Sequence, residues 1–488
     1  MARYVVAPYE KTMVPTARQL HVVNRLGWGY RRSTFKQLLR AGGETEWFEQ
    51  QLDPASIVES RKAAAVDDWF PDLHASAADT WAEVRAGRRR HGDVARALAG
   101  AALLRRVYSR RPVLEQMVDF WSNHLHVSSR HPQAFTQRPA YDEVVRRHAL
   151  GRFEDLLVEA SLHPAMLIWL DNWQSVRGAP NENHGRELLE LHTVGLGAGY
   201  TEAMVKDSAK ILSGYTVYNA GASAWSGWYD PGKHTTGAVR VLDFRAANDA
   251  ADGSQLAVDY LRYLARHPAT ATRIARKLAV RFVSDTPPPA LVERVAQAYL
   301  ASGTDIKETL RALVRSKEFW ASAGQKVRTP MDDLVATCRV LGVKAAAPTD
   351  DLGFACRVAA LPASTMPFEW PRPDGPPDTA DVWAAPNRML ASWRMHWALG
   401  GGYWPRQDVT YKQPASWLPA DRIRFDRFVD HLSRVLLGRP STPELLEAAC
   451  TGIDAAPGDV VTRQHAVIRY KMPRLCAVLL DTPAHMTR

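Results

Sequence analysis

The stretch from Asn181 to Gly195 constrains the fold most, because ionisable side chains are interspersed with leucines in a segment that has the features of a helix. Pro180 disfavours helix at the residue before it, and Asn181 or Asn183 can cap the helix that follows. Gly195 and Gly197 close it, as glycines do just past helix ends. A helix that is apolar on most sides is usually buried, so this one is expected to lie inside the protein.

The polar residues of this helix form a single stripe. At about 100° per residue, Asn183, Arg186, Glu187 and Glu190 fall on one side, while the leucines cover the rest of the surface. His192 lies roughly opposite the stripe if the helix continues that far, and it joins the carboxylates only if the helix ends early. A buried polar stripe needs partners, so these residues are candidates for a functional site.

Helical spacing of apolar residues continues through most of the chain, which predicts a mainly α fold. We expect a large multi-helical domain with long irregular loops and at most a minor β-hairpin, within residues 215–245. No internal repeat or strong linker divides the chain, so residues 1–488 are interpreted as one domain. Its core is expected at about residues 17–345, and an aromatic and proline-rich tract with C-terminal helices, residues 346–488, is expected to pack on it.

Composition narrows the functional classes. The net charge of +10 favours an anionic substrate, partner or surface, but no RNP, zinc-finger or glycine-rich phosphate motif accompanies it, so a nucleic-acid partner is not expected. The four cysteines are far apart and form no CxxC pair, which argues against a disulfide framework or a zinc ribbon. No apolar run is long enough for a membrane span, and no signal peptide precedes the first helix, so a cytoplasmic location is expected.

A second polar group lies at the end of the helix predicted from Pro112. Asn123, His124 and His126 follow an apolar stripe that includes Phe120 and Trp121. Paired polar rings are unusual in a core unless they have partners. The ordinary alternative is that each ring simply hydrogen-bonds to a nearby carbonyl group.

Taken together, several motifs resemble one bacterial family, catalogued as domain of unknown function 1800. The resemblance runs from roughly residue 17 to the end, and it rests on Phe120-Trp121-Ser122-Asn123-His124, Leu170-Asp171-Asn172, the 181–195 stretch, His267-Pro268, the Trp-Pro-x-Pro-Asp-Gly tract and Asp481-Thr-Pro-Ala-His-Met. It implies little chemistry. Many relatives sit beside a gene for a phosphatase- or sulfatase-like protein, which implies such a protein as a partner. This chain departs from the family by having His184 in place of an aromatic residue, and His234-Thr235 in place of His-Asp.

The first functional hypothesis is a metal-dependent enzyme, hydrolytic or oxidative. Glu187 and Glu190 can point two carboxylates at one ion, and His124, His126 and His192 would complete a ligand set suited to Fe, Mn or Zn. Residues that could orient these ligands are Asn123, Asp171, Asn181, Asn183 and His234. Against a metal, Arg186 could instead join Glu182 and Glu190 in an ion-pair network.

Two other possibilities stay open. In an enzyme without a metal, Glu187 or Glu190 would act as general base and His124 as acid, so that the catalytic candidates are Glu187, Glu190, His124 and Arg186. The absence of a GxGxxG motif or P-loop from the sequence argues against a nucleotide cofactor. The second hypothesis is a non-catalytic helical partner, a scaffold or maturation factor, which would bind through residues 366–386 and 215–235.

Overall fold

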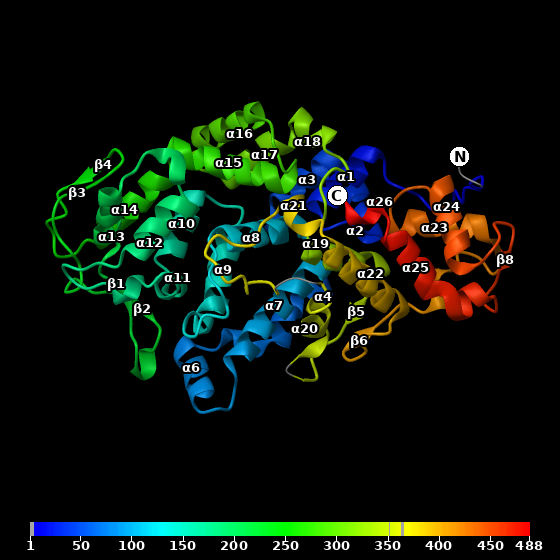
Figure 1. Cartoon of the computed structure of the whole chain (residues 1–488), viewed down its shortest axis with the longest axis horizontal. Helices are drawn as coiled ribbons and strands as arrows, with labels where there is room; N and C mark the ends of the chain where they lie inside the picture. The colour runs from blue at the N-terminus through cyan, green and yellow to red at the C-terminus, as the bar shows by residue number, and fades with distance from the viewer. Residues whose placement is uncertain (1–3, 351, 363–365) are drawn as a thin grey trace.

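The computed structural model describes residues 4–350, 352–362 and 366–488, and most of this part of the chain is helical (Figure 1). The prediction of a mainly α fold is confirmed. The helices of the first half are α1 (Ala17–Leu26), α2 (Arg32–Ala41), α3 (Glu44–Gln51), α4 (Arg61–Ala64), α5 (Val66–Trp69), α6 (Ala77–Arg85), α7 (His91–Tyr108), α8 (Pro112–His124), α9 (Arg138–His148), α10 (Phe153–Ser161), α11 (Pro164–Trp169), α12 (Glu182–Glu187) and α13 (Glu202–Leu212).

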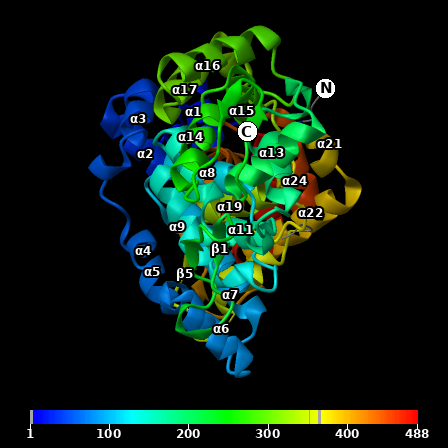
Figure 2. The same cartoon turned by 90° about the vertical axis from the view of Figure 1, so that its left-hand side faces the viewer.

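The second half is helical as well. They are α14 (Ser254–Ala265), α15 (Pro268–Phe282), α16 (Pro289–Ala301), α17 (Ile306–Val314), α18 (Lys317–Ala321), α19 (Pro330–Leu341), α20 (Gly353–Ala359), α21 (Ala380–Trp383), α22 (Pro386–Gly401), α23 (Phe425–Leu436), α24 (Pro443–Ile453), α25 (Met472–Leu480) and α26 (Pro483–Met486). In Figures 1 and 2, α16 and α17 lie along the upper edge of the molecule and α6 lies at the lower edge. No helix in the described ranges combines the length and apolar character that crossing a membrane requires.

The β structure is small but more extensive than the single hairpin expected. The described residues contain four two-stranded antiparallel sheets. Two are local hairpins, formed by β1 (Tyr215–Val217) with β2 (Gly227–Tyr229) and by β3 (Val239–Val241) with β4 (Phe244–Ala246). The others join distant segments, namely β5 (Lys344–Ala345) with β6 (Val409–Thr410) and β7 (Ile423–Arg424) with β8 (Val460–Val461). Strands of two residues have no recognisable sequence period, so these last pairings could not be predicted.

Local capping chemistry explains several helix starts. Thr16 caps α1 and Thr329 caps α19, each as part of a capping box. The His267-Pro268 pair of the family motif begins α15, because the imidazole Nδ1 accepts a hydrogen bond from the Ala269 amide and the proline occupies the first turn. The same arrangement occurs at His163-Pro164, where α11 begins. Both histidines therefore have a structural role.

Two hydrophobic clusters fill the interior. The larger includes Trp121 of α8 and Leu278 of α15, and the second includes Met395 of α22 and Leu475 of α25. A charged residue, Arg25 of α1, is also fully buried. Its guanidinium donates to the carbonyl oxygens of Phe282, Ser322 and Arg488, each at 2.7 Å, so that distant parts of the chain are joined at one side chain.

Candidate functional site

A cavity of about 420 Å³ lies between α8, α15, α19 and the aromatic and proline-rich tract 366–378. Its walls are mostly apolar and include Phe120, Val280, Met331, Phe368 and Trp370. Figure 1 shows the tract in yellow, passing beside α8. An apolar cavity into which a few polar groups converge is the usual form of a small-molecule site.

The tract is held in place by backbone contacts with the end of α8 and the segment after it. His126 Nε2 donates to the Trp370 carbonyl oxygen at 2.9 Å, and the Ser129 amide donates to that of Phe368 at 2.8 Å. Gly375 lies against Asn123, with a φ of +71° that favours glycine, and a Cβ added there would come within 2.1 Å of the Asn123 carbonyl oxygen. The tract is therefore a fixed wall of the cavity, and Phe368 and Glu369 are buried in it.

The main polar group of the cavity is a contact between Lys277 of α15 and His124 of α8. Lys277 Nζ lies 3.0 Å from His124 Nδ1, and His124 Nε2 lies 3.0 Å from the His192 carbonyl oxygen. Since a carbonyl oxygen can only accept, Nε2 carries the imidazole proton and Nδ1 accepts from the lysine. His124 thus holds the Lys277 amine at the cavity wall.

Burial lowers the pKa values of both residues in this contact. Desolvation, with a smaller effect of Arg273, lowers the pKa of Lys277 to about 7, although Asp374 opposes the shift. Desolvation and the nearby Lys277 also hold the pKa of His124 well below its ordinary value. At neutral pH the imidazole is neutral and the amine is close to its midpoint, so the amine can accept or release a proton.

The remaining charges of the cavity are largely neutralised by one another. Arg106 pairs with Asp119 at 2.7 Å, and Arg281 pairs with both Asp119 and Asp332 at 3.3 Å. Arg372 pairs with Asp374 at 3.2 Å. Among the described residues, Arg276 has no hydrogen bond or ion pair through its side chain, and it is exposed at the cavity.

The predicted polar stripe begins as expected and then changes form. Asn181 caps α12 by accepting from the Asn183 amide at 2.9 Å. Arg186 lies 3.5 Å from Glu182 and 3.7 Å from Glu190, and it also binds Glu202 of α13 at 2.6 Å. The ion-pair network considered as the alternative to a metal is therefore present. Its members are only partly buried, because the stripe faces α13 and solvent instead of the core.

Glu187 is the charged member of the stripe that takes no part in this ion-pair network among the described residues. Burial and Glu190 raise the pKa of its carboxyl group, Arg186 opposes them, and Asp374 of the cavity wall adds a smaller upward effect. Glu187 itself does not line the cavity. The negative charge of Asp374, which does line it, contributes to raising the pKa of Glu187.

A π-helical turn, Leu188–His192, follows α12 and redirects the end of the stretch. His192 is fully buried, and its ring lies 6.3 Å from that of His124, measured between centroids. Within the described residues, neither ring nitrogen of His192 or His184 has a hydrogen-bond partner, and the same holds for His126 Nδ1. Burial lowers the pKa of His126 and of His184 to about 4. These histidines are neutral, and several of their nitrogens are free to accept a ligand.

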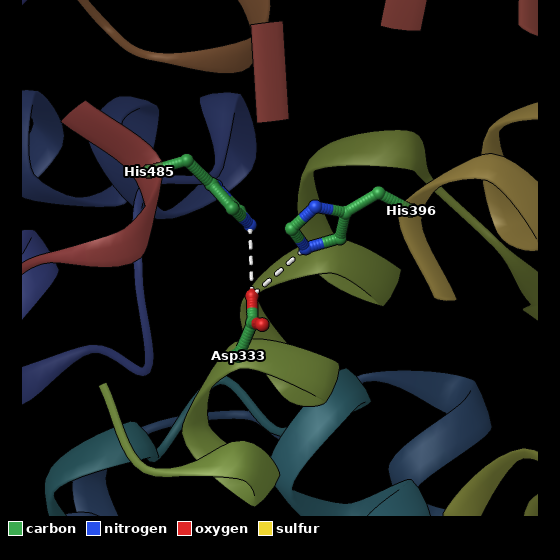
Figure 3. Close-up of side chains that lie close together, drawn as sticks. All are labelled: Asp333, His396 and His485. Carbon is green, nitrogen blue, oxygen red and sulfur yellow. Dashed lines mark hydrogen bonds and ion pairs between the residues drawn. The ribbon is translucent and has the colours of Figure 1, made fainter. Parts of the chain in front are cut away.

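The predicted metal ligands are near one another but do not form a closed set. In the described part of the chain, the single group whose ligand atoms all lie within 4.8 Å of one another is Asp333, His396 and His485 (Figure 3). That group does not include any of the predicted ligands His124, His126, Glu187, Glu190 and His192.

The group in Figure 3 is a buried hydrogen-bond network. His396 Nε2 donates to Asp333 at 3.0 Å, and His396 Nδ1 donates to Asp481 at 2.6 Å. Ser392 donates to the second Asp333 oxygen at 2.7 Å, and the Arg388 guanidinium lies 3.6 Å from it. A carboxylate with these partners beside an arginine does not fit a divalent cation.

The predicted orienting residues have local partners. The acceptors of the His234 ring are the Ser213 carbonyl oxygen, 3.0 Å from Nδ1, and the Asn248 side-chain oxygen, 2.8 Å from Nε2, so His234 stabilises its own loop. Thr235 follows His234 in place of the aspartate expected from the family resemblance. In this chain, Asn248 supplies an oxygen acceptor to the ring of His234. Asp171 accepts from Gln174 at 2.8 Å, and Asn183 donates to the Leu170 carbonyl oxygen at 3.3 Å. Asn123 lies at the cavity.

Sequence reasoning missed Lys277, Asp333 and His396. Each stands alone in an ordinary helical sequence, so no local pattern distinguishes it. Asp481 and His485, by contrast, belong to the tail motif that contributed to the family resemblance, and that motif was the available signal.

The fold and the cavity define a class of large helical proteins in which a ligand-sized cavity is closed by a proline-rich tract. The chain belongs to the family described as Protein of unknown function (DUF1800), whose sequence profile matches residues 21–487. No curated protein and no solved structure matches the chain.

Proposed function

We propose that this protein is an enzyme that binds a small organic anion in the cavity and uses the Lys277 amine as its reacting group. The observation that carries the proposal is the 3.0 Å contact between Lys277 and His124 at the cavity wall. Strongly shifted pKa values in a cleft are characteristic of functional sites. Lys277 would serve as proton acceptor or nucleophile, and His124 would be the residue that positions it.

The lining of the cavity supports the class of substrate. Arg276 is exposed and unpaired in the described structure, so it can bind an anionic group. The aromatic and proline side chains opposite it favour an apolar body for the same molecule. An unpaired arginine at the cavity therefore supports the expectation of an anionic substrate, which was drawn from the net charge.

Competitive acylation tests the proposal. The protein is labelled with trace acetic anhydride at a series of pH values, and each lysine-containing peptide is quantified by mass spectrometry. Lys277 is expected to gain reactivity with a midpoint near pH 7, because burial lowers its pKa to about 7. Incubation with pyruvate and cyanoborohydride then tests whether the amine can act as a nucleophile: Lys277 would lose water with the ketone to form an imine, which the added hydride reduces to a stable secondary amine.

The partly exposed Lys307 serves as the internal reference. The Lys277→Met variant identifies the peptide signal. If Lys277 becomes reactive only at about pH 10, as an unperturbed lysine does, the proposed role of the amine is wrong. The same conclusion follows if the cavity excludes the reagent at every pH while Lys307 is labelled normally.

A metal-dependent enzyme is the second candidate, and the unpartnered nitrogens of His184, His192 and His126 favour it. Neutral imidazoles are good ligands for Fe, Mn or Zn, and buried polar atoms without partners are rare. The nearby Lys277 and Arg273, which lower the pKa of His192, act against a cation at this position.

Elemental analysis after metal-replete expression tests this candidate. The variants are Glu187→Gln and His192→Ala, with His21→Ala as a matched buried histidine whose ring is already bound to the Phe319 carbonyl oxygen. The metal candidate requires near-stoichiometric metal in the wild type and in His21→Ala, and its loss from the other two. A metal-free wild type contradicts it.

A further inference from the structure

A second region of the surface, separate from the cavity, is strongly basic. A groove of about 900 Å³ runs between α2, residues 56–62, the end of α7 and β5. It shares no lining residue with the cavity that contains Lys277. Its basic side chains are Arg31, Lys36, Arg40, Arg61, Lys62, Arg110 and Lys344.

A neighbouring groove extends this basic region. It has a volume of about 690 Å³ and shares Arg31, Ser33 and Gly342 with the first groove. It adds the exposed basic side chains of Lys11, Arg32 and Lys412. Arg339 also lines it but is buried, and its guanidinium donates to the Arg106 and Val107 carbonyl oxygens and to the Thr34 hydroxyl. The two grooves therefore meet at the start of α2, where Arg31 and Ser33 lie.

No acidic residue neutralises these cations. Among the described residues, neither groove has an aspartate or glutamate in its lining, and none of the basic side chains named above lies within 4.0 Å of a carboxylate. Those that do have partners use neutral ones. Arg31 donates to the Val107 carbonyl oxygen at 2.9 Å, and Lys412 lies 3.5 Å from the ring centroid of Trp417.

One acidic residue beside the first groove, Glu59, is bound to the protein backbone and to a serine, not to these cations. It accepts from the amides of Ser60 and Arg110 at 2.7 Å and from the Ser109 hydroxyl at 2.6 Å. These bonds fix the backbone of the groove wall. Glu59 forms no ion pair with the basic side chains of the groove, which are left to repel one another.

Repulsion between these cations lowers the pKa of some of them. After burial, the charge of Lys344 is the next factor that lowers the pKa of Lys62. Arg110 likewise contributes to lowering the pKa of Arg31, after burial. A set of like charges without counterions raises the local potential, and an anion that binds there relieves it.

We propose that the two grooves together bind a linear anion that carries several phosphate groups. The cations are spread over two adjoining grooves, which suits a chain of charges better than a single phosphate. The first turn of α2 has neither an acidic residue nor a side-chain cap, so its amides can also face the anion. The site is independent of the function proposed for Lys277.

The lining favours polyphosphate over nucleic acid. Single-stranded nucleic acids bind with their bases stacked on accessible aromatic rings. In the grooves, Tyr108 and Trp417 are buried. The half-buried Tyr9 packs edge-on against the His431 ring, with 5.4 Å between the ring centroids. The Tyr108 hydroxyl also donates to the Val343 carbonyl oxygen at 2.9 Å. These rings are therefore occupied by protein contacts, and the groove offers charge and hydroxyl groups instead.

Titration of the full-length protein with linear polyphosphate, followed by calorimetry at several salt concentrations, tests the proposal. Wild type is expected to bind with an affinity that falls steeply as salt increases. The Lys36→Glu/Arg40→Glu variant changes two exposed positions on α2 and is expected to weaken binding by about tenfold or more and to reduce the salt dependence. The control, Arg85→Glu/Arg262→Glu, makes the same change of charge on other exposed helices and should bind like wild type.

Arg61→Gln, on α4, provides a second and milder variant if the double variant has an altered circular dichroism spectrum. Inorganic phosphate is expected to bind far more weakly than the chain. The proposal is overturned if polyphosphate does not bind, or if the control variant loses as much affinity as the groove variant. It is also overturned if an oligothymidylate of equal charge binds more tightly than polyphosphate, because the grooves would then be a nucleic-acid site.

Discussion

His396 carries a buried positive charge between two carboxylates. Both of its ring nitrogens donate, one to Asp333 and the other to Asp481. These partners outweigh desolvation and raise its pKa from 6.5 to about 9. His485, on the other side of Asp333, has the opposite shift, because burial lowers its pKa to about 4. One histidine of the network is therefore charged at neutral pH and the other is neutral.

The stability of the protein should depend on pH through His396. A histidine whose pKa is raised on folding contributes its full stabilisation below 6.5 and loses it as the pH rises through about 9. The His396→Gln variant should therefore be destabilised most at pH 6.5 and least at pH 10, by a difference on the order of 3 kcal/mol. Urea unfolding of wild type and variant at both pH values measures it.

His485→Gln is the matched control for this experiment. Its histidine is already neutral across the window, since its pKa is about 4, so its cost should not change between the two pH values. Comparing each variant with wild type cancels the contribution of Lys277, which titrates in the same range. A His396→Gln cost that is the same at pH 6.5 and pH 10 would show that the imidazole is not charged.

At the scale of elements, the proline-rich tract shapes the cavity more than any single helix does. It crosses from α20 to α21 and supplies Phe368, Trp370 and Asp374 to the lining. Its position depends on close approach to the end of α8, and Gly375 marks the closest point. The tract and α8 are therefore fixed relative to each other. A substitution that moves either one should change the accessibility of Lys277.

Gly375→Ala should displace the tract. The new Cβ meets the Asn123 carbonyl oxygen at 2.1 Å in a backbone of positive φ, so both a clash and strain result. The matched control is Gly178→Ala, which has a φ of +82° but no atom within 4 Å of the added Cβ. The control should lose about 1–2 kcal/mol from backbone strain alone. Gly375→Ala should lose clearly more in urea unfolding and should make Lys277 easier to acylate, and equal losses would contradict the close contact.

The stretch 181–195 illustrates what the sequence can predict about an element. The helix start and its Asn181 cap follow from local chemistry and are present as expected. The π-helical turn could not be predicted from local sequence. Its last residue, His192, accepts a hydrogen bond at its carbonyl oxygen from His124, which is distant in the chain. This turn determines where His192 points. The polar stripe was expected to be buried, but its residues are only partly buried, because they face α13, whose Glu202 binds Arg186.

For the whole molecule, helical periodicity is sufficient to predict the class of fold, and the motifs are sufficient to predict the family. The candidate site was only half predictable. Asn123 and His124 were identified from their unusual setting on an aromatic helix, whereas Lys277 acquires significance only through a contact with a residue 153 positions away. The basic grooves likewise combine residues from the start, the middle and the end of the chain, so the net charge indicated their chemistry but not their location.

The buried Arg25 has a consequence for how the chain matures during synthesis. Its side chain needs the carbonyl oxygens of Phe282 and Ser322 and finally that of Arg488, which leaves the ribosome 463 residues after the arginine itself. Until then α1 carries a cation that cannot be desolvated without loss of hydrogen bonds. The full set of native hydrogen bonds of the Arg25 guanidinium can therefore form only after residues 282, 322 and 488 have all been synthesised, and water must satisfy its N–H groups before then.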